Sequence, residues 1–349
     1  MNINQLVRPN ILKMKAYSSA RDEFKGMASV FLDANENPYP HDGLNRYPDP
    51  LAMAVKREIA KIKDVETENI FLGNGSDEVI DVLVRIFCEP RLDNIITLPP
   101  TYGMYQVSAD TADVSVRTIN LTADFQPNVE EILRGADERS KILFICSPNN
   151  PTANSIEAGK ILNLLNAFKG IVVVDEAYID FAAQQSCIDW IQTFPNLVVT
   201  QTFSKAWGMA GIRLGMAFSS KTVIDLMNKV KPPYNVNALT QRAALDLLKN
   251  KAAKKDANVK EILAEREKMA AILRGYDFIE NVYPSDANFL LVKMPRPNEM
   301  YQWFLAHGIV VRNRNNVILC EGCLRLTVGT PEENATLLQA FKESQFLIA

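Results

Sequence analysis

Short apolar runs alternate with stretches of helical period between about residues 69 and 220. The runs are NIFLG, NIITL, ILFIC, IVVVD, LVVTQT and LGMAFSS, and helical stretches such as SDEVIDVLVRIF and IEAGKILNLLNAF stand between them. Runs such as IVVV lack the polar alternation of a half-exposed strand, which is typical of strands covered on both faces. The pattern therefore predicts an α/β fold, with a large domain of three layers, α/β/α, around a mostly parallel sheet.

A second pattern begins after KPPYNVN, residues 231–237, where two prolines interrupt the alternation. Long charged helices are expected up to about Arg274, and their interspersed acidic residues indicate a solvated face rather than a basic binding patch. NFLLVKM, PNEMYQWFLAHG, IVVRN, LRLTVG and a last helix then form an α+β pattern. We expect a large domain over 41–235, a smaller α+β domain over 236–349, and an arm over 1–40 that joins the smaller domain or a neighbouring subunit.

The composition is that of a globular chain, with 47% apolar and 23% charged residues among 349. A formal net charge of −3 excludes a generally basic surface for nucleic acid. No apolar run approaches the roughly 20 residues that cross a bilayer, and the first residues lack the apolar segment of a secretory signal. We therefore expect a cytoplasmic protein with no nucleic-acid and no membrane partner.

Cysteine and histidine restrict the chemistry further. Five cysteines over a long chain do not describe a secreted disulfide framework, so reduced thiols are expected. Cys320 and Cys323 form one CxxC motif, but a zinc site needs a second pair or nearby histidines, and His41 and His307 are the only histidines. No metal is expected. If the protein is an enzyme, a group other than histidine must transfer its protons.

TQTFSKAWGMAGIRLG, residues 200–215, is the most informative segment. Lys205 follows the end of the LVVTQT strand, and Arg213 comes eight positions later in a loop with glycines. A buried lysine at a strand end can lose its proton and attack a carbonyl compound to form a Schiff base. The alternative is an ordinary surface lysine after a strand.

Asp175 ends the buried run IVVVD, where a carboxylate without a cationic partner would be costly. A pyridinium nitrogen meets that need, since an adjacent aspartate keeps it protonated and makes a pyridoxal ring an effective electron sink. Lys205 would then hold the aldehyde of the same cofactor. A structural salt bridge from Asp175 to an arginine or lysine is the competing interpretation.

LGNGSDEVIDVL, residues 72–83, predicts a strand, a glycine-rich turn and a helix with Ser76 at its N-cap. The free N–H groups at such a helix start bind phosphate, and glycine lets the anion approach the backbone. A dinucleotide fingerprint is disfavoured because its third glycine is missing.

Tyr102 in PPTYGMY and Asn150 in SPNNPT follow two further strands. Tyr102, Asn150, Asp175 and Lys205 are therefore all expected at the carboxyl ends of successive strands.

In these motifs the chain resembles the fold-type I pyridoxal-phosphate aminotransferases, and among them the group that acts on histidinol phosphate. The resemblance covers nearly the full length, through AYSSARDE, LDANENPYP, RYPDP, GNGSDE, PTYGMY, SPNNPT, DEAYIDF, TFSKAWGMAGIRLG and CLRLTVGTPEEN in family order. It implies a homodimer with pyridoxal 5'-phosphate as cofactor. The implied reaction transfers the amino group of histidinol phosphate to 2-oxoglutarate and yields imidazole-acetol phosphate and glutamate, in histidine biosynthesis.

The resemblance also implies a role for individual residues. Lys205 is the catalytic lysine, Asp175 pairs with the ring nitrogen, Tyr178 and Asn150 bond the ring hydroxyl oxygen, and Tyr102 stacks on the ring. The cofactor phosphate is held by the backbone at Gly75, Ser76 and Asp77 together with Thr202, Ser204 and Arg213, while Tyr47 reaches the site of the partner subunit. The substrate-binding residues are Arg325 for the α-carboxylate, Tyr17 and Arg312 for the phosphate, and Asn35.

One position departs from the family pattern, which usually has NPTG where this chain has NPTA with Ala153. We therefore expect a different loop shape after Asn150.

An aromatic-amino-acid aminotransferase or a decarboxylase of a phosphorylated amino acid would use the same cofactor residues and differ around Tyr17, Arg312 and Arg325. A regulator that has kept a non-catalytic pyridoxal-phosphate-binding domain is a more distant alternative.

Overall fold

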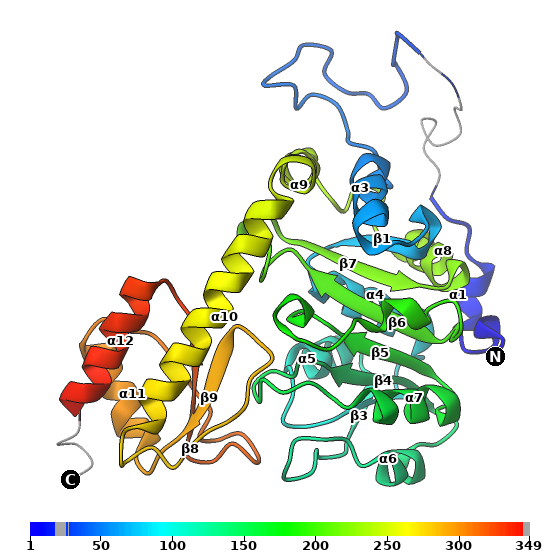
Figure 1. Cartoon of the computed structure of the whole chain (residues 1–349). Coiled ribbons are helices and arrows are strands. Elements are labelled where there is room, and N and C mark those ends of the chain that lie inside the picture. The colour runs from blue at the N-terminus through cyan, green and yellow to red at the C-terminus, as the bar shows by residue number, and fades with distance from the viewer. Residues whose placement is uncertain (18–25, 27, 345–349) are drawn as a thin grey trace.

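The structure is a computed structural model that describes residues 1–17, 26 and 28–344. The part of the AYSSARDE motif from residue 18 onwards lies outside the described residues. A large domain and a smaller domain stand side by side, and the long helix α10 (Ala252–Arg274) runs from one to the other (Figure 1).

A seven-stranded sheet forms the centre of the large domain, in the order β1-β7-β6-β5-β4-β2-β3. β7 is antiparallel to both of its neighbours, and the other pairs are parallel. The strands are β1 (Ile70–Asn74), β2 (Asn94–Thr97), β3 (Ser115–Thr118), β4 (Ser140–Cys146), β5 (Ile171–Asp175), β6 (Leu197–Thr202) and β7 (Leu214–Ser219). The mostly parallel sheet confirms the predicted fold class. The sequence did not indicate β3, a short edge strand without fully buried side chains.

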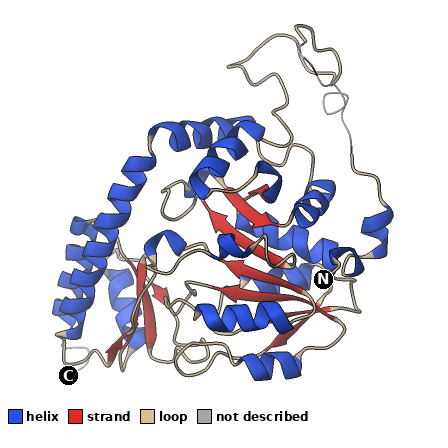
Figure 2. Cartoon of the chain, turned by 45° about the vertical axis from the view of Figure 1, so that its right-hand side comes forward, coloured by secondary structure: helices blue, strands red, loops and turns tan. Residues whose placement is uncertain are grey.

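Consecutive residues of β5 belong to different cores. Val172 and Val174 pack into a cluster on one face of the sheet, whereas Ile171 and Val173 pack into a cluster on the other. The first cluster is covered by α3 (Met53–Lys63), α6 (Val129–Gly135), α7 (Ala158–Ala167) and α9 (Ala238–Asn250), the second by α4 (Ser76–Phe87), α5 (Met104–Thr111) and α8 (Lys221–Val230). The unbroken apolar run IVVV thus reflects burial on both faces, with helices on either side of the strands (Figure 2).

The first thirteen residues lie on the large domain. Ile3 and Ile11, from η1 (Ile3–Gln5) and α1 (Pro9–Lys13), belong to the same cluster as α4 and α8. The Arg8 N–H donates to the Ile86 carbonyl at 3.0 Å. The predicted contact of this part of the arm with the smaller domain is therefore wrong.

The smaller domain carries a four-stranded antiparallel sheet in the order β10-β11-β9-β8, packed against helices. Its elements are β8 (Asn281–Val282), β9 (Phe289–Lys293), α11 (Pro297–Ala306), β10 (Arg312–Asn313), β11 (Cys323–Thr327) and α12 (Pro331–Glu343). α9 still belongs to the core of the large domain, and Met269 and Leu273 of α10 belong to that of the smaller domain. The change of domain therefore falls within α10, later than the predicted residue 236. Short 3-10 helices occur at η2 (Thr67–Asn69), η3 (Ile179–Phe181), η4 (Cys187–Trp190) and η5 (Ala210–Ile212).

Three properties of the described residues bear on function. None of their helices combines the length and apolar character that crossing a membrane requires. No group of three or more His, Cys, Asp or Glu side chains in this part of the chain is placed to hold a metal ion. All five cysteines are free and buried, Cys320 and Cys323 among them.

Candidate active site

The residues that follow β2, β4, β5 and β6 line a cavity of about 870 Å³. These strands are parallel neighbours, so their carboxyl ends meet at one edge of the sheet, as the sequence predicted. β10 and β11 of the smaller domain contribute to the same cavity. The predicted residues that line it are Ser76, Asp77, Tyr102, Asn150, Asp175, Tyr178, Thr202, Ser204, Lys205, Arg213, Arg312 and Arg325.

Asp175 is buried at the end of β5. One carboxylate oxygen accepts the Tyr105 hydroxyl at 2.8 Å, and the other accepts the Ala177 N–H at 3.2 Å. Burial raises the pKa of Asp175, while these hydrogen bonds oppose the rise. Tyr105 is itself fully buried and stacks on Phe144, with ring centroids 4.5 Å apart. The sequence analysis missed Tyr105. Its position three residues after Tyr102 at a helix start was the available signal.

Lys205 follows β6 and is open to the cavity. Its Nζ lies 5.5 Å from the centroid of the Tyr178 ring. Burial of the amine and the positive charge of Arg325 lower the pKa of Lys205, whereas Asp175 opposes that effect. A lysine with a lowered pKa is a better nucleophile and a better general base near neutral pH.

The turn between β1 and α4 lies beside Arg213. Gly75 precedes the helix with a φ of +80°, and α4 begins at Ser76, so Gly75 rather than Ser76 is the N-cap. A Cβ on Gly75 would lie 2.7 Å from Arg213 Nη2, and a Cβ on Gly215 of β7 would lie 2.2 Å from the Ser76 nitrogen. The two glycines therefore let the Arg213 guanidinium and β7 approach the start of α4 closely, beside N–H groups that lack helical partners and can bind an anion.

Asp77, Thr202 and Ser204 complete this part of the cavity. The Asp77 carboxylate forms an ion pair with Arg213 at 3.3 Å and accepts the Tyr102 hydroxyl at 3.1 Å. The Thr202 hydroxyl donates to that of Ser204 at 3.0 Å. One guanidinium, two hydroxyls and the free N–H groups of a helix start form a donor set suited to a phosphate group.

Asn150 stands in a loop that other residues hold in place. The Asn149 side-chain amide donates to the Pro100 carbonyl at 2.8 Å and to the Thr152 hydroxyl at 2.7 Å, a role that the sequence analysis did not assign. Ala153 has a φ of +69°, which is the left-handed conformation that favours glycine. The chain thus places an alanine in a backbone conformation that is strained for it and that glycine adopts readily.

Three arginines line the cavity from the smaller domain. The Arg325 guanidinium donates to the Asn150 side-chain oxygen across the two domains, and it lies 5.2 Å from the centroid of the Phe289 ring. Arg312 pairs directly with Arg325 between β10 and β11. Arg314, which the sequence analysis treated only as a neighbour of Arg312, also lines the cavity. Burial lowers the pKa of Arg325.

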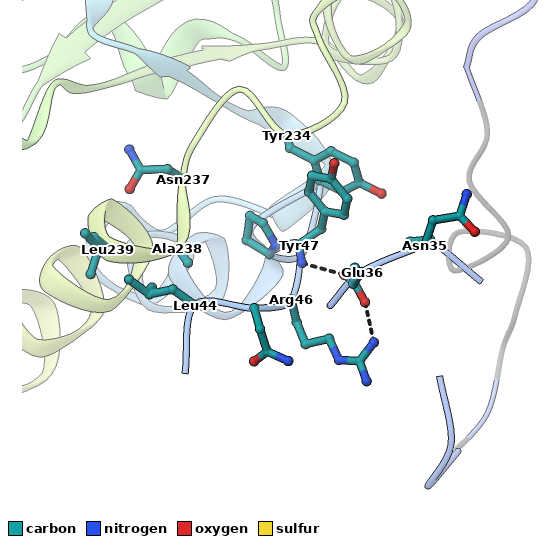
Figure 3. A pocket seen from close by; sticks show the side chains of 12 residues that line it. Asn35, Glu36, Leu44, Arg46, Tyr47, Tyr234, Asn237, Ala238 and Leu239 are labelled. Atoms are coloured by element: carbon teal, nitrogen blue, oxygen red, sulfur yellow. Dashed lines mark hydrogen bonds and ion pairs between the residues drawn. The ribbon is translucent and has the colours of Figure 1, made fainter. Parts of the chain in front are cut away.

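The other three predicted residues lie away from this cavity. Tyr17 is 68% exposed. Asn35 and Tyr47 line a second hollow, and the Tyr47 ring lies face to face with that of Tyr234 at 4.5 Å (Figure 3). Glu36 holds this segment by accepting the Tyr47 N–H at 2.6 Å and pairing with Arg46 at 2.7 Å. A single chain therefore does not bring Tyr17, Asn35 and Tyr47 to Lys205.

The model of the family described as aminotransferase class I and II matches residues 23–341 of this chain. The chain belongs to the class I and II aminotransferases. The match spans both domains and every residue that lines the cavity. This confirms the predicted enzyme class and the predicted cofactor, since these aminotransferases use pyridoxal phosphate.

Individual aminotransferases resemble the chain over nearly its whole length. A protein of Parabacteroides distasonis named histidinol-phosphate aminotransferase is 54% identical over 341 residues, 98% of each chain. One of the same name from Christiangramia forsetii is 54% identical over 344 residues, 98% of each. The crystal structure of the histidinol-phosphate aminotransferase from Clostridium acetobutylicum superposes with a TM-score of 0.80 at 25% identity, covering 87% of this chain and 92% of that one. These aminotransferases confirm the resemblance predicted from the motifs.

Proposed function

We propose that this aminotransferase moves the amino group of L-histidinol phosphate to 2-oxoglutarate, giving imidazole-acetol phosphate and L-glutamate in histidine biosynthesis. The observation that carries the proposal is the 54% identity to the Parabacteroides distasonis protein of that name over 98% of both chains. The cavity supports it, because Arg312, Arg314 and Arg325 lie together there and suit substrates with anionic groups.

The cavity fits pyridoxal phosphate at both ends of the cofactor. At one end, Asp175 is a buried carboxylate without an ion-pair partner among the described residues, and it would hold the proton of the ring nitrogen. At the other, the backbone at Ser76 and Asp77 and the side chains of Thr202, Ser204 and Arg213 would bind the phosphate beside Gly75 and Gly215. Asn150 and Tyr178 would bond the ring hydroxyl oxygen, and Tyr102 would stack on the ring. When bound, the cofactor supplies an electron sink for charge that develops on the substrate.

The residues of the chain perform the remaining steps. Lys205 would hold the cofactor through its aldehyde, and its amine would move a proton at the substrate carbon that carries the amino group. A lysine thus performs the proton transfer, for which the sequence analysis expected a group other than histidine. Arg325 would orient the α-carboxylate of glutamate, and Arg312 would bind the phosphate end of histidinol phosphate. Tyr17 at the phosphate and Asn35 at the substrate lie away from this cavity in the single chain and would join it from the partner subunit.

Product analysis tests the proposed reaction. With histidinol phosphate and 2-oxoglutarate, the purified protein is expected to form equal amounts of glutamate and imidazole-acetol phosphate and to release no carbon dioxide. An aromatic amino acid is expected to be a slower amine donor. Carbon dioxide from a phosphorylated amino acid, or faster transfer from the aromatic donor, would support the alternatives instead. Absence of turnover with every donor would favour the regulator.

We also propose that the active unit is a homodimer in which Tyr47 of one subunit reaches the cavity of the other. The described segment from residue 28 extends away from the body of the chain (Figure 1) and returns to it by Ala52, which is buried. Several large apolar side chains of this segment are exposed in the single chain, among them Leu32 at 87% and Tyr39 at 80%. An exposed apolar patch of this kind is typical of a protein interface. The segment is anchored at its base, since Arg242 donates to the Gly43 carbonyl at 2.6 Å.

Mixed dimers test the shared site. Tyr47→Ala and Lys205→Ala chains are each expected to be inactive alone, and mixing them should restore part of the activity because one hybrid site receives both intact residues. Activity after subunit exchange, with hybrids counted by mass spectrometry, is the measurement. Two tagged forms of Lys205→Ala, mixed in the same way, are the control. Hybrids that form without gaining activity would argue against a shared site.

A further inference from the structure

Arg312, Arg314 and Arg325 lie on one face of the small sheet. Arg312 and Arg325 are directly paired between β10 and β11, and such pairs project their side chains to the same side. Arg314 comes two positions after Arg312, and its N–H donates to the Cys323 carbonyl at 2.9 Å, which continues the pairing by one step. Since strand side chains alternate with a period of two, Arg314 shares the face of the other two arginines. All three side chains line the cavity.

The half-buried Arg314, like the exposed Arg312, has no side-chain partner among the described residues. Within the described ranges its guanidinium forms neither a hydrogen bond nor an ion pair, and its Nε is buried and unbonded. By contrast, Arg325 donates to Asn150. Burial and the nearby charges of Arg325 and Arg312 lower the pKa of Arg314 to about 10. A half-buried cation beside two others destabilises the folded chain unless an anion joins it.

The carboxylates of the cavity do not supply that anion. Among the residues that the structure describes, Asp77 and Asp175 are the acidic side chains that line it. Asp77 is paired with Arg213, and Asp175 accepts the Tyr105 hydroxyl. Both lie at the proposed cofactor end. The three arginines therefore carry positive charge that the protein itself leaves uncompensated, and a ligand is the remaining source of the anion.

We propose that Arg314 is a substrate-binding residue that holds the phosphate of the amine substrate together with Arg312, and the distal carboxylate of 2-oxoglutarate in the second half of the reaction. The proposal rests on the proposed function. Arg325 is engaged with Asn150 beside Lys205, and Arg312 is exposed, so Arg314 is the half-buried guanidinium left to meet a second anionic group. A doubly charged phosphate opposite two guanidinium groups is a common arrangement in anion recognition.

Arg314→Gln tests the contact by comparing two substrates that differ only in the phosphate. We expect kcat/KM for histidinol phosphate to fall by about ten- to a hundredfold, the range of a lost charge-assisted hydrogen bond. The kcat/KM for histidinol, which has no phosphate, should change by less than about threefold, because no contact is removed. Arg314→Lys keeps the positive charge but not the planar guanidinium group, and it should recover part of the lost kcat/KM for histidinol phosphate. Arg274→Gln at the exposed end of α10 is the matched control.

Direct binding and stability separate this role from a structural one. Inorganic phosphate should bind the cofactor-loaded Arg314→Gln enzyme at least about tenfold more weakly than the wild type, measured by the change in cofactor absorbance. The thermal midpoint should not fall, since an unpaired half-buried charge is removed. Equal losses of kcat/KM with both amines, unchanged kcat/KM with both, or a lower midpoint with unchanged phosphate binding would each overturn the proposal. If the wild type does not convert histidinol phosphate, the proposed function is wrong, and phosphate binding still decides the role of Arg314.

Discussion

Lys205→Ala should leave a folded protein that transaminates at least about 10²–10⁴-fold more slowly than the wild type. The described cavity has one lysine among its lining residues, so no other amine there can take over the proton transfer. The same variant should lose the visible absorbance of covalently held cofactor. Borohydride treatment of the wild type should fix the cofactor on the peptide that contains Lys205, which mass spectrometry identifies.

A lysine on the outside of the fold provides the control. Lys221 pairs with Asp225 at 2.9 Å on the exposed side of α8, and Lys221→Ala should keep both the rate and the absorbance. Normal transamination by Lys205→Ala, or cofactor fixed on another peptide, would remove Lys205 from its assigned role. Circular dichroism of each variant shows that the loss does not come from unfolding.

Asp175→Asn should bind the cofactor and yet turn over about 10²–10³-fold more slowly, because an amide cannot keep a ring nitrogen protonated in a buried site. Tyr105→Phe keeps the carboxylate and removes the hydroxyl that orients it, so it should lose less activity than Asp175→Asn. The measurements are kcat, cofactor content, and the pH dependence of cofactor absorbance. The pH at which the ring nitrogen loses its proton should move downward in Asp175→Asn but not in Tyr105→Phe, because loss of the hydroxyl donor makes the Asp175 carboxylate a stronger base.

Glu176 next to Asp175 offers a matched comparison. It is equally buried, but its carboxylate accepts the Cys187 N–H at 2.6 Å and the Gln201 side-chain amide at 2.8 Å, and it does not line the cavity. Glu176→Gln should therefore leave the pH dependence of cofactor absorbance unchanged, whatever it does to stability. Wild-type kcat in Asp175→Asn would show that the Asp175 carboxylate serves only the fold.

The sequence predicted the parts of the site that local pattern determines. Asp175 ends the apolar run IVVV and Lys205 follows the end of β6 by three residues, and strands buried on both faces align in parallel, so their carboxyl ends meet. Tyr105 and Arg314 were missed for a different reason. Tyr105 becomes relevant only because α5 faces the end of β5, and Arg314 only because β10 pairs with β11. Such contacts depend on packing between segments that are distant in the chain.

The placement of the N-terminal residues was mispredicted for a related reason. Ile3, Val7 and Ile11 have a helix-like apolar spacing, but no neighbouring segment of the sequence indicates what they pack against. The surface that covers them forms only when α4 and α8 have assembled. Ala153 is a similar case. Its left-handed conformation is unusual for alanine, and it is accompanied by hydrogen bonds to distant residues, such as that from the Asp286 N–H to the Ala153 carbonyl at 2.7 Å, which the local sequence does not indicate.

Gly215 affects how experiments on the site are interpreted. Its α-carbon faces the turn at Gly75 and Ser76, and the missing methyl group is what lets β7 approach so closely. Alanine scanning detects contacts by removing side-chain atoms. It is not designed to detect Gly215, which contributes because it has no side chain. Adding one carbon at Gly215 would displace the backbone that we propose to face the cofactor phosphate, while the side chains proposed to bind the phosphate stay intact. A random mutant with this change would be recorded as a cofactor-binding defect at a residue that does not touch the cofactor.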